Sequence, residues 1–119
     1  MIHHIETIAT QVFKEARHEG LSEMEAVACT LVNQANKGLF HPPACPKHTF
    51  YNKEITAHPL FQIAHRITVR AFNGLLKDPT KGATRYHKIT QHPSWAHKLI
   101  PCAQSRCRLF YKGESYAGN

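Results

Sequence analysis

The fold is decided at residues 12–27, VFKEARHEGLSEMEAV, where two helical patterns meet at a short turn. Before the turn, apolar residues recur at spacings of three and four, which predicts an amphipathic helix over residues 2–19. These residues are Ile5, Ile8, Ala9, Val12 and Ala16. Gly20 follows at the position where glycine commonly terminates a helix, so we expect the first helix to end there.

A second helix is predicted directly after the glycine. Ser22 and Glu25 form the capping box Ser-x-x-Glu, in which the serine caps the helix and the glutamate reaches back to it. The apolar residues that follow share one helical face and stop near Gly38: Met24, Val27, Ala28, Leu31, Val32 and Ala35. Two helices joined by so short a turn form a corner, which we expect to be the framework of the fold.

The remainder of the chain predicts a loop, one more helix and a small sheet. Residues 38–54 hold three prolines and little periodicity, which is typical of a loop or a lid. A third helix starts near Pro59, with the apolar positions Leu60, Ile63, Ala64, Ile67, Ala71 and Leu75. Residues 83–87 and 108–112 are rich in residues that favour strands, and residues 92–99 favour a short helical turn.

Length and composition indicate one globular domain, residues 1–119, of the α+β class: mainly helical, with a short C-terminal β element. The formal net charge of +7 favours a polyanionic partner, such as nucleic acid, an anionic membrane surface or a cell-wall polymer. No apolar run is long enough for a membrane span. The first residues lack the apolar segment of a signal peptide, so we expect a cytoplasmic protein or export by a route that the chain does not encode.

Glu15 is the candidate acid of the first helix. On a helical wheel it falls at the border of the apolar stripe, where a carboxyl group is partly desolvated and still faces a groove. Partial burial and the neighbouring charge of Glu19 favour the protonated form that a general acid needs. The same pattern fits a solvated surface charge, and pairing with Lys14 or Arg17 would cancel the effect.

Other chemistries find weaker support in the sequence. His41, Cys45 and His48 cluster in the proline-rich loop, but neither Cys-x-x-Cys nor His-Glu-x-x-His is present, so we expect no metal and no cofactor. Cys102 and Cys107 are close enough to bridge across a turn, although the reduced form is favoured. No glycine pattern frames a serine or cysteine nucleophile.

Two blocks of the sequence resemble the SleB/CwlJ-type cell-wall hydrolases, which include the spore-cortex-lytic enzymes and their phage and bacterial relatives. Residues 12–34 match the family pattern of Glu-Ala-Arg, then Glu, Ala-Val-Ala and Asn, in register. Residues 78–88 resemble the family's Gly-Ala-Thr-x-Tyr block, and PSWAHKL and RLFYK resemble its closing region. The resemblance covers nearly the whole chain and is weakest over residues 39–58, where the family's Gly-Gln-Phe-Ser stretch is missing.

The resemblance implies a lysozyme-like domain that cleaves peptidoglycan between N-acetylmuramic acid and N-acetylglucosamine. It further implies a lytic transglycosylase with Glu15 as its single acid and base. The sequence offers few acids that could act beside Glu15, which fits a mechanism with one carboxylate, because ordinary glycoside hydrolysis uses two. The substrate-binding residues expected from the matching blocks are Glu19, Glu23, Asn33, Thr84, Tyr86 and His87. For Asn33, a structural amide that bonds backbone is an equal alternative, and for Trp95 a packing role is favoured.

Three alternatives stay open: a muramidase-type hydrolase, an inactive module that binds glycan and, behind both, a basic nucleic-acid-binding domain. We expect a monomer whose partner is peptidoglycan, with no nucleic acid and no membrane span. Its place of action would be the bacterial cell wall, in the periplasm or outside the cell. Since no signal peptide is recognised, release through a holin, as for a phage endolysin, is the simplest route.

Overall fold

The computed structural model describes residues 2–41 and 53–113 of the chain. Its helices are α1 (Ile2–Ala16), α2 (Leu21–Asn36), the short α3 (Lys53–Thr56) and α4 (Pro59–Phe72). Its strands are β1 (Arg85–Lys88), β2 (Ala103–Gln104) and β3 (Arg108–Tyr111), with a 3-10 helix at Ser94–Ala96. The predicted α+β class, mainly helical with a small C-terminal sheet, is confirmed.

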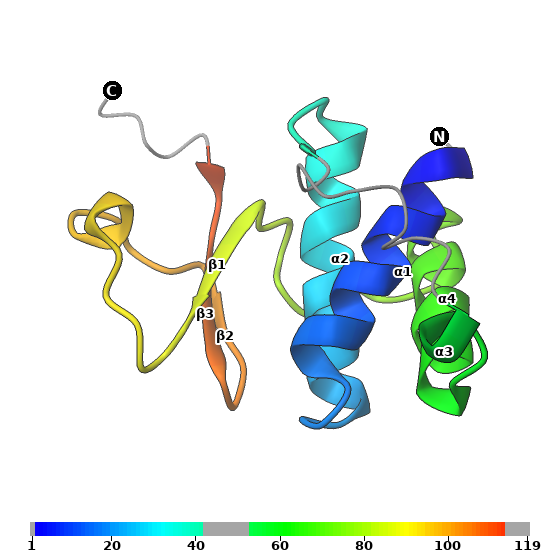
Figure 1. Ribbon diagram of the computed structural model, residues 1–119. Helices are drawn as coiled ribbons and strands as arrows, with labels where there is room; N and C mark the ends of the chain where they lie inside the picture. The colour runs from blue at the N-terminus through cyan, green and yellow to red at the C-terminus, as the bar shows by residue number, and fades with distance from the viewer. Residues whose placement is uncertain (1, 42–52, 114–119) are drawn as a thin grey trace.

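The larger core lies between α1, α2 and α4, which pack against one another. Figure 1 shows these helices on one side of the molecule and the sheet on the other, with α2 between α4 and the sheet. The stripes predicted from helical spacing supply most of the buried side chains, among them Ile8, Val12, Ala16, Met24, Val27, Leu31, Ala64 and Ile67. Burial of apolar surface, at about 25 cal/mol per Å², therefore holds the helix corner together.

The three strands form an antiparallel sheet in the order β1-β3-β2, so β3 is central. Side chains alternate along a strand, and the face toward the helices carries Tyr86, Arg108 and Phe110. A second, smaller core joins this face to α2 through Ala26 and Ala83. The packing brings β1 and β3 to the C-terminal end of α1.

The turn between α1 and α2 differs from the prediction, because Ser22 does not cap the helix. Gly20 is the N-cap of α2 with a φ of 100°, and no side chain makes a cap hydrogen bond. Glycine suits this position because other residues rarely adopt a positive φ. The reason for the shift is tertiary: Glu23 is buried against Arg108 and Ser105, which fixes the first helical turn two residues earlier than predicted.

Some element boundaries also differ from the predictions. α1 ends at Ala16, before residue 19, and α4 ends at Phe72, so Leu75 is exposed instead of buried in a stripe. The short elements α3 and β2 were not predicted, because neither is long enough to show a periodic pattern. Among the described helices, none combines the length and the apolar character needed to cross a bilayer.

Candidate active site

Glu15 lies half-buried in the last turn of α1, opposite β1. Its Oε2 accepts a hydrogen bond of 2.9 Å from Nε2 of Gln11, one turn earlier on the same helix. Its Oε1 accepts a hydrogen bond from the hydroxyl of Tyr86 on β1. Among the ion pairs of the described residues, none involves Glu15. Two neutral donors from two different elements therefore orient this carboxylate.

The nearby Arg17 does not neutralise Glu15. Its Nη1 donates to the backbone carbonyl of Phe13 at 3.1 Å, and its guanidinium lies 4.5 Å from the centroid of the Phe13 ring. This contact holds the cation on the flank of α1, so the pairing considered from the sequence is not formed.

Tyr86 is packed between the sheet and the helices. Burial, and after it the carboxylate of Glu15, raises the pKa of Tyr86, so its phenol stays protonated and serves as a donor. The guanidinium of Arg108 lies 5.6 Å from the centroid of its ring, and the ring of Phe110 lies 6.1 Å away. These contacts fix the direction of the hydroxyl toward Glu15.

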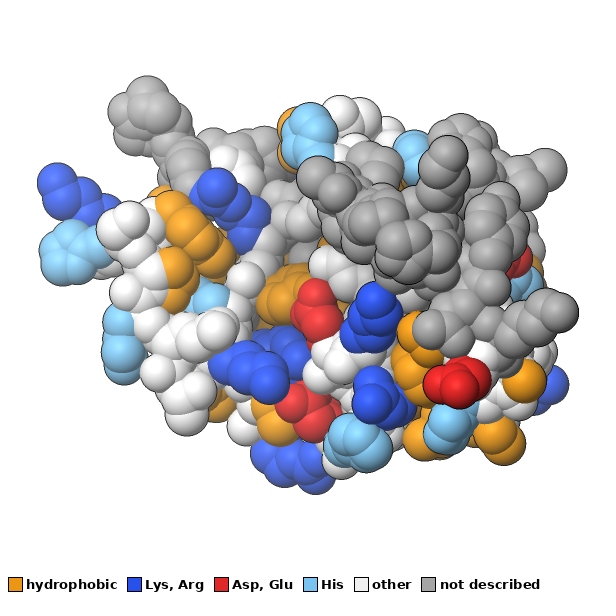
Figure 2. Space-filling model, viewed as in Figure 1, with side chains coloured by type: hydrophobic (Ala, Val, Ile, Leu, Met, Phe, Trp, Pro, Cys, Tyr) orange, Lys and Arg blue, Asp and Glu red, His pale blue; other side chains and the backbone are white. Residues whose placement is uncertain are grey.

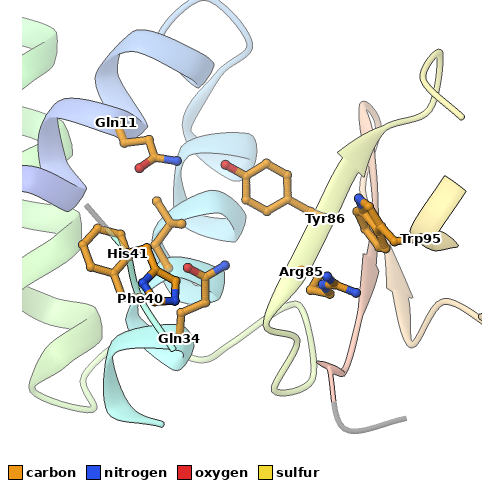
Figure 3. Close-up of a pocket in the computed structure, with 8 residues that line it drawn as sticks. Gln11, Gln34, Phe40, His41, Arg85, Tyr86 and Trp95 are labelled. Carbon is orange, nitrogen blue, oxygen red and sulfur yellow. The ribbon is translucent and has the colours of Figure 1, made fainter. Parts of the chain in front are cut away.

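A pocket of about 330 Å³ opens beside Tyr86, between the helices and β1. Its described lining residues are Gln11, Leu31, Gln34, Phe40, His41, Arg85, Tyr86 and Trp95. Figure 3 shows Arg85 and Trp95 together on the sheet side, and the hydroxyl of Tyr86 directed toward Gln11 across the gap. Since both hydrogen-bond partners of Glu15 line the pocket, the carboxylate lies next to it.

Arg108 forms a buried ion cluster with the two acids that follow Glu15 in the sequence. Its side chain is 0% exposed, and Nη1 lies 2.6 Å from Oε1 of Glu19 and 2.9 Å from Oε1 of Glu23. Its Nη2 also donates to the backbone carbonyl of Glu15 at 3.4 Å. Figure 2 shows acidic and basic side chains side by side near the middle of this face, where the sheet meets the helices. The cluster ties β3 to the end of α1.

The charge of Glu19 is compensated within this cluster. Burial alone would raise its pKa, but the hydrogen bond and the charge of Arg108, with Lys88 at 3.5 Å, hold the pKa below its ordinary value of 4.5. Glu19 is therefore a fixed anion and not a free charge acting on Glu15. The carboxylate of Glu23 also accepts from Ser105 Oγ at 2.9 Å and is 2% exposed, so it serves the cluster and presents no surface to a ligand.

Glu19, Glu23 and Cys107 bring possible metal-ligand atoms within 4.8 Å of one another. The guanidinium of Arg108 already places a positive charge between the two carboxylates, which is the position that a cation would take. The cluster is therefore an ion network of protein side chains, in which Arg108 supplies the positive charge.

The metal-ligand candidates predicted from the sequence were His41, Cys45 and His48. His41 lines the pocket, whereas Cys45 and His48 lie outside the described residues. Cys102 and Cys107 are both free thiols, which agrees with the reduced form favoured by the sequence.

Asn33 acts on the loop that leads into β1. Its Nδ2 donates to Asp78 Oδ2 and to the carbonyl of Ala83, each at 2.9 Å. Burial alone would raise the pKa of Asp78, but hydrogen bonds from Asn33, Thr80 and Gly82 outweigh it and lower the pKa. Asn33 thus has the structural role that was its alternative, since it anchors the loop before β1.

Thr84 and His87, also expected to bind substrate, lie away from Glu15. Thr84 is buried, its Oγ1 accepts from the backbone N–H of Gly113 at 2.8 Å, and it borders a neighbouring pocket. His87 lies on the opposite face of the sheet, with Nε2 2.8 Å from the hydroxyl of Tyr111 and its ring against Trp95. Of the residues expected to bind substrate, Tyr86 is the one that contacts the Glu15 carboxylate.

Gln11 and Arg108 are the residues that the sequence reading missed. Gln11 had a signal, because a polar residue four positions before Glu15 lies on the same helical face. Arg108 had none that distinguishes it from its neighbours, since it is one of many basic residues in a strand-like segment.

Neither the protein-family models nor the curated proteins searched match this chain. Among solved structures, the catalytic domain of the SleB protein from Bacillus cereus is similar, with a TM-score of 0.69 and 22% sequence identity. The match covers 94% of this chain and 91% of that domain. The chain therefore has the fold of the SleB catalytic domain, as its two sequence blocks predicted.

Proposed function

We propose that this protein cleaves the glycan strand of peptidoglycan between N-acetylmuramic acid and N-acetylglucosamine, as a lytic transglycosylase with Glu15 as acid and base. The observation that carries the proposal is the isolation of Glu15. Two neutral donors hold it beside the pocket, whereas Arg108 binds the two acids that follow it. The resemblance of the sequence to cell-wall hydrolases, and the fold shared with the SleB catalytic domain, support the choice of substrate.

The isolation of Glu15 favours transglycosylation over hydrolysis. In ordinary glycosidases two carboxyl groups, about 5 to 9.5 Å apart, flank the bond that is cleaved. Here Glu19 and Glu23 are the acids nearest to Glu15 along the chain, and both are bound to Arg108. When a hydroxyl of the substrate itself attacks, no second carboxylate is needed.

The proposed reaction has two proton transfers, both at Glu15. Protonated Glu15 gives its proton to the glycosidic oxygen while the bond from that oxygen to C1 of the muramyl residue breaks, which releases the N-acetylglucosamine hydroxyl. The Glu15 carboxylate then takes the proton of the muramyl C6 hydroxyl, and the C6 oxygen bonds to C1. The product carries a 1,6-anhydro ring, no water is consumed, and Glu15 regains its proton.

Gln11 and Tyr86 act as positioning residues in this scheme. Each donates to one oxygen of Glu15, so together they stabilise the carboxylate formed after the first proton transfer. Both also line the pocket, which fixes the carboxyl group relative to a bound sugar. The net charge of +7 suits a wall polymer whose peptides carry carboxylates, so we place the activity at the bacterial cell wall.

Incubation with purified sacculi tests the proposal through the products released. We expect soluble muropeptides that end in anhydromuramic acid, identified by mass spectrometry, and none from Glu15→Gln. Products with reducing ends would replace the transglycosylase by a muramidase. Sedimentation with sacculi without release would indicate a glycan-binding module, and salt-sensitive DNA binding without wall activity would indicate a nucleic-acid-binding domain.

A further inference from the structure

β1 is an edge strand of the sheet, and it borders the pocket beside Glu15. In the strand order β1-β3-β2, β1 pairs with β3 on one side, and no described strand pairs with its other side. Such an edge presents backbone N–H and C=O groups that have no partner within the sheet. Arg85 and Tyr86, the first two residues of β1, both line the pocket. The backbone of β1 therefore belongs to the surroundings of a substrate bound there.

The backbone groups of Tyr86 face this free edge. Along an antiparallel pair, successive residues alternate between bonding the partner strand and facing away from it. The N–H of Ile89 donates to the carbonyl of Cys107 at 2.9 Å, so every second residue before Ile89 also bonds toward β3. The carbonyl of Phe110, which is the partner of Tyr86 in the register, accepts on the side of β2 instead, at 2.8 Å. The N–H and C=O groups of Tyr86 and Lys88 therefore point away from β3.

Glutamine side chains cap this edge on both sides of Tyr86. Before it, the carbonyl of Thr84 accepts from Nε2 of Gln34 at 2.7 Å. After it, the N–H of Lys88 donates to Oε1 of Gln91 at 3.1 Å. Within the described part of the chain, no group donates to or accepts from the backbone of Tyr86 at this edge. Tyr86 is therefore one open position between two capped ones, and its own side chain bonds Glu15.

We propose that the open edge at Tyr86 binds the peptide stem of peptidoglycan as a one-residue addition to the sheet. The choice of peptidoglycan rests on the proposed function. A residue of an extended peptide presents its N–H and its C=O to the same side, as Tyr86 does, so the two residues can exchange two hydrogen bonds. The acetamido group of a sugar is a single trans amide whose N–H and C=O point in opposite directions, so it can form only one of these bonds.

The consequence of this contact is a fixed position of the muramyl residue relative to Glu15. The stem is attached to the muramyl residue through its lactyl group, whereas N-acetylglucosamine carries no stem. Tyr86 orients Glu15 through its side chain and holds the stem through its main chain. Binding of the stem thus selects, of the two alternating sugars, the one whose C1 the proposed reaction requires.

Titrations followed by two-dimensional amide NMR test the proposal with muramyl dipeptide and with its ester analogue, in which an oxygen replaces the N–H of the alanine. We expect the full chain to bind muramyl dipeptide roughly fivefold to tenfold more tightly than the analogue, which lacks the donor to the Tyr86 carbonyl. The amide proton of Tyr86 should shift on binding. That of Lys88, already bonded to Gln91, should shift much less.

Ester replacements in the protein test the other bond. Replacement of Tyr86 by the corresponding α-hydroxy acid removes its N–H, keeps its side chain and should lower the affinity for muramyl dipeptide by a similar factor. The same replacement at Lys88 is the matched control, because the N–H removed there faces the same edge and is already bonded to Gln91. It should leave the affinity unchanged. The amide spectrum of each variant reports whether the fold is intact.

Equal affinity for muramyl dipeptide and its ester analogue, an equal loss in the two protein replacements, or no binding of muramyl dipeptide would overturn the proposal. Equal affinity for acetylated alanyl-isoglutamine would overturn it as well, because the occupant would then be an extended peptide unrelated to the glycan. Because these ligands are bound and not cleaved, the result stands or falls separately from the sacculus assay.

Discussion

Glu15 and Glu19 are carboxylates only four residues apart, yet Glu15 has neutral hydrogen-bond donors as partners and Glu19 has cations. Glu15 accepts from an amide and a phenol, both neutral, at the edge of a pocket. Glu19 accepts from the buried guanidinium of Arg108 and also faces Lys88. Glu15 therefore has no cation among its described partners, whereas the buried guanidinium of Arg108 compensates the charge of Glu19.

We propose a catalytic role for Glu15, whereas Glu19 helps to join the sheet to the helices. Arg108 reaches Glu19, Glu23 and the backbone of Glu15 from β3, so it fastens the sheet to the helix corner. Tyr86 reaches Glu15 from β1 in the same sheet. The ion cluster therefore holds the element that orients the proposed catalytic residue.

The largest effect is expected from Glu15→Gln, which keeps the shape of the side chain and removes the proton that it transfers. Release of muropeptides should fall on the order of 100-fold to 10,000-fold, the usual contribution of a general acid. The free energy of unfolding should stay within about 0.5 kcal/mol of the wild type, because Glu15 takes part in no ion pair among the described residues.

Glu6→Gln is the matched control for this variant. Glu6 is an exposed acid of the same helix whose carboxylate faces His65, away from the pocket lining. It should retain full activity. If Glu15→Gln retained full activity as well, the proposed mechanism would be wrong.

Arg108→Met should, in contrast to Glu15→Gln, cause a large loss of stability. It leaves the buried Glu23 carboxylate without its cation, and the loss of one partner of a buried pair costs about 3–5 kcal/mol. Urea denaturation measures the free energy of unfolding. Arg106→Met, at an exposed position two residues earlier, should cost much less.

A double variant keeps this prediction testable if Arg108→Met alone does not fold. Adding Glu23→Gln removes the stranded charge and should restore part of the lost stability. No recovery in the double variant, or a loss in Arg108→Met as small as in Arg106→Met, would show that the cluster does not hold the sheet.

Tyr86→Phe should lower kcat roughly tenfold, which is about 1.4 kcal/mol of barrier, with little change in KM. The variant keeps the ring against Phe110 and removes only the donor to Glu15. Tyr111→Phe is the matched control, because that hydroxyl bonds His87 on the opposite face of the sheet. Equal kcat in the two variants would deny Tyr86 a role in positioning Glu15.

The smallest effect concerns stability in acid. The folded pKa of Glu19 lies below its ordinary value of 4.5, so its stabilising contribution is complete above that value and is lost as the pH falls through the folded pKa. The Tm of Glu19→Gln should therefore lie below that of the wild type at pH 7, and the gap should close as the pH falls well below 4.5. A gap that stays constant with pH would contradict the ion pair with Arg108, and Glu6→Gln serves as the reference.

The sequence by itself determined the helix stripes, the corner near Gly20, the strand-like segments and the position of Glu15 at the border of an apolar stripe. These features follow from local spacing, because a helix repeats its faces every few residues whatever surrounds it. Gln11 belongs with them, since it lies one turn from Glu15 on the same helix.

Only the tertiary structure decided that Arg108 pairs with Glu19 and not with the carboxylate of Glu15. Tyr86 meets Glu15 across 71 residues of chain, and Arg108 meets Glu19 across 89, so neither contact leaves a trace in local spacing. The start of α2 at Leu21 has the same origin, because the burial of Glu23 against Arg108 overrides the capping box at Ser22. Burial of a carboxylate requires a cation, and the place of that cation is set by the packing of the sheet on the helices.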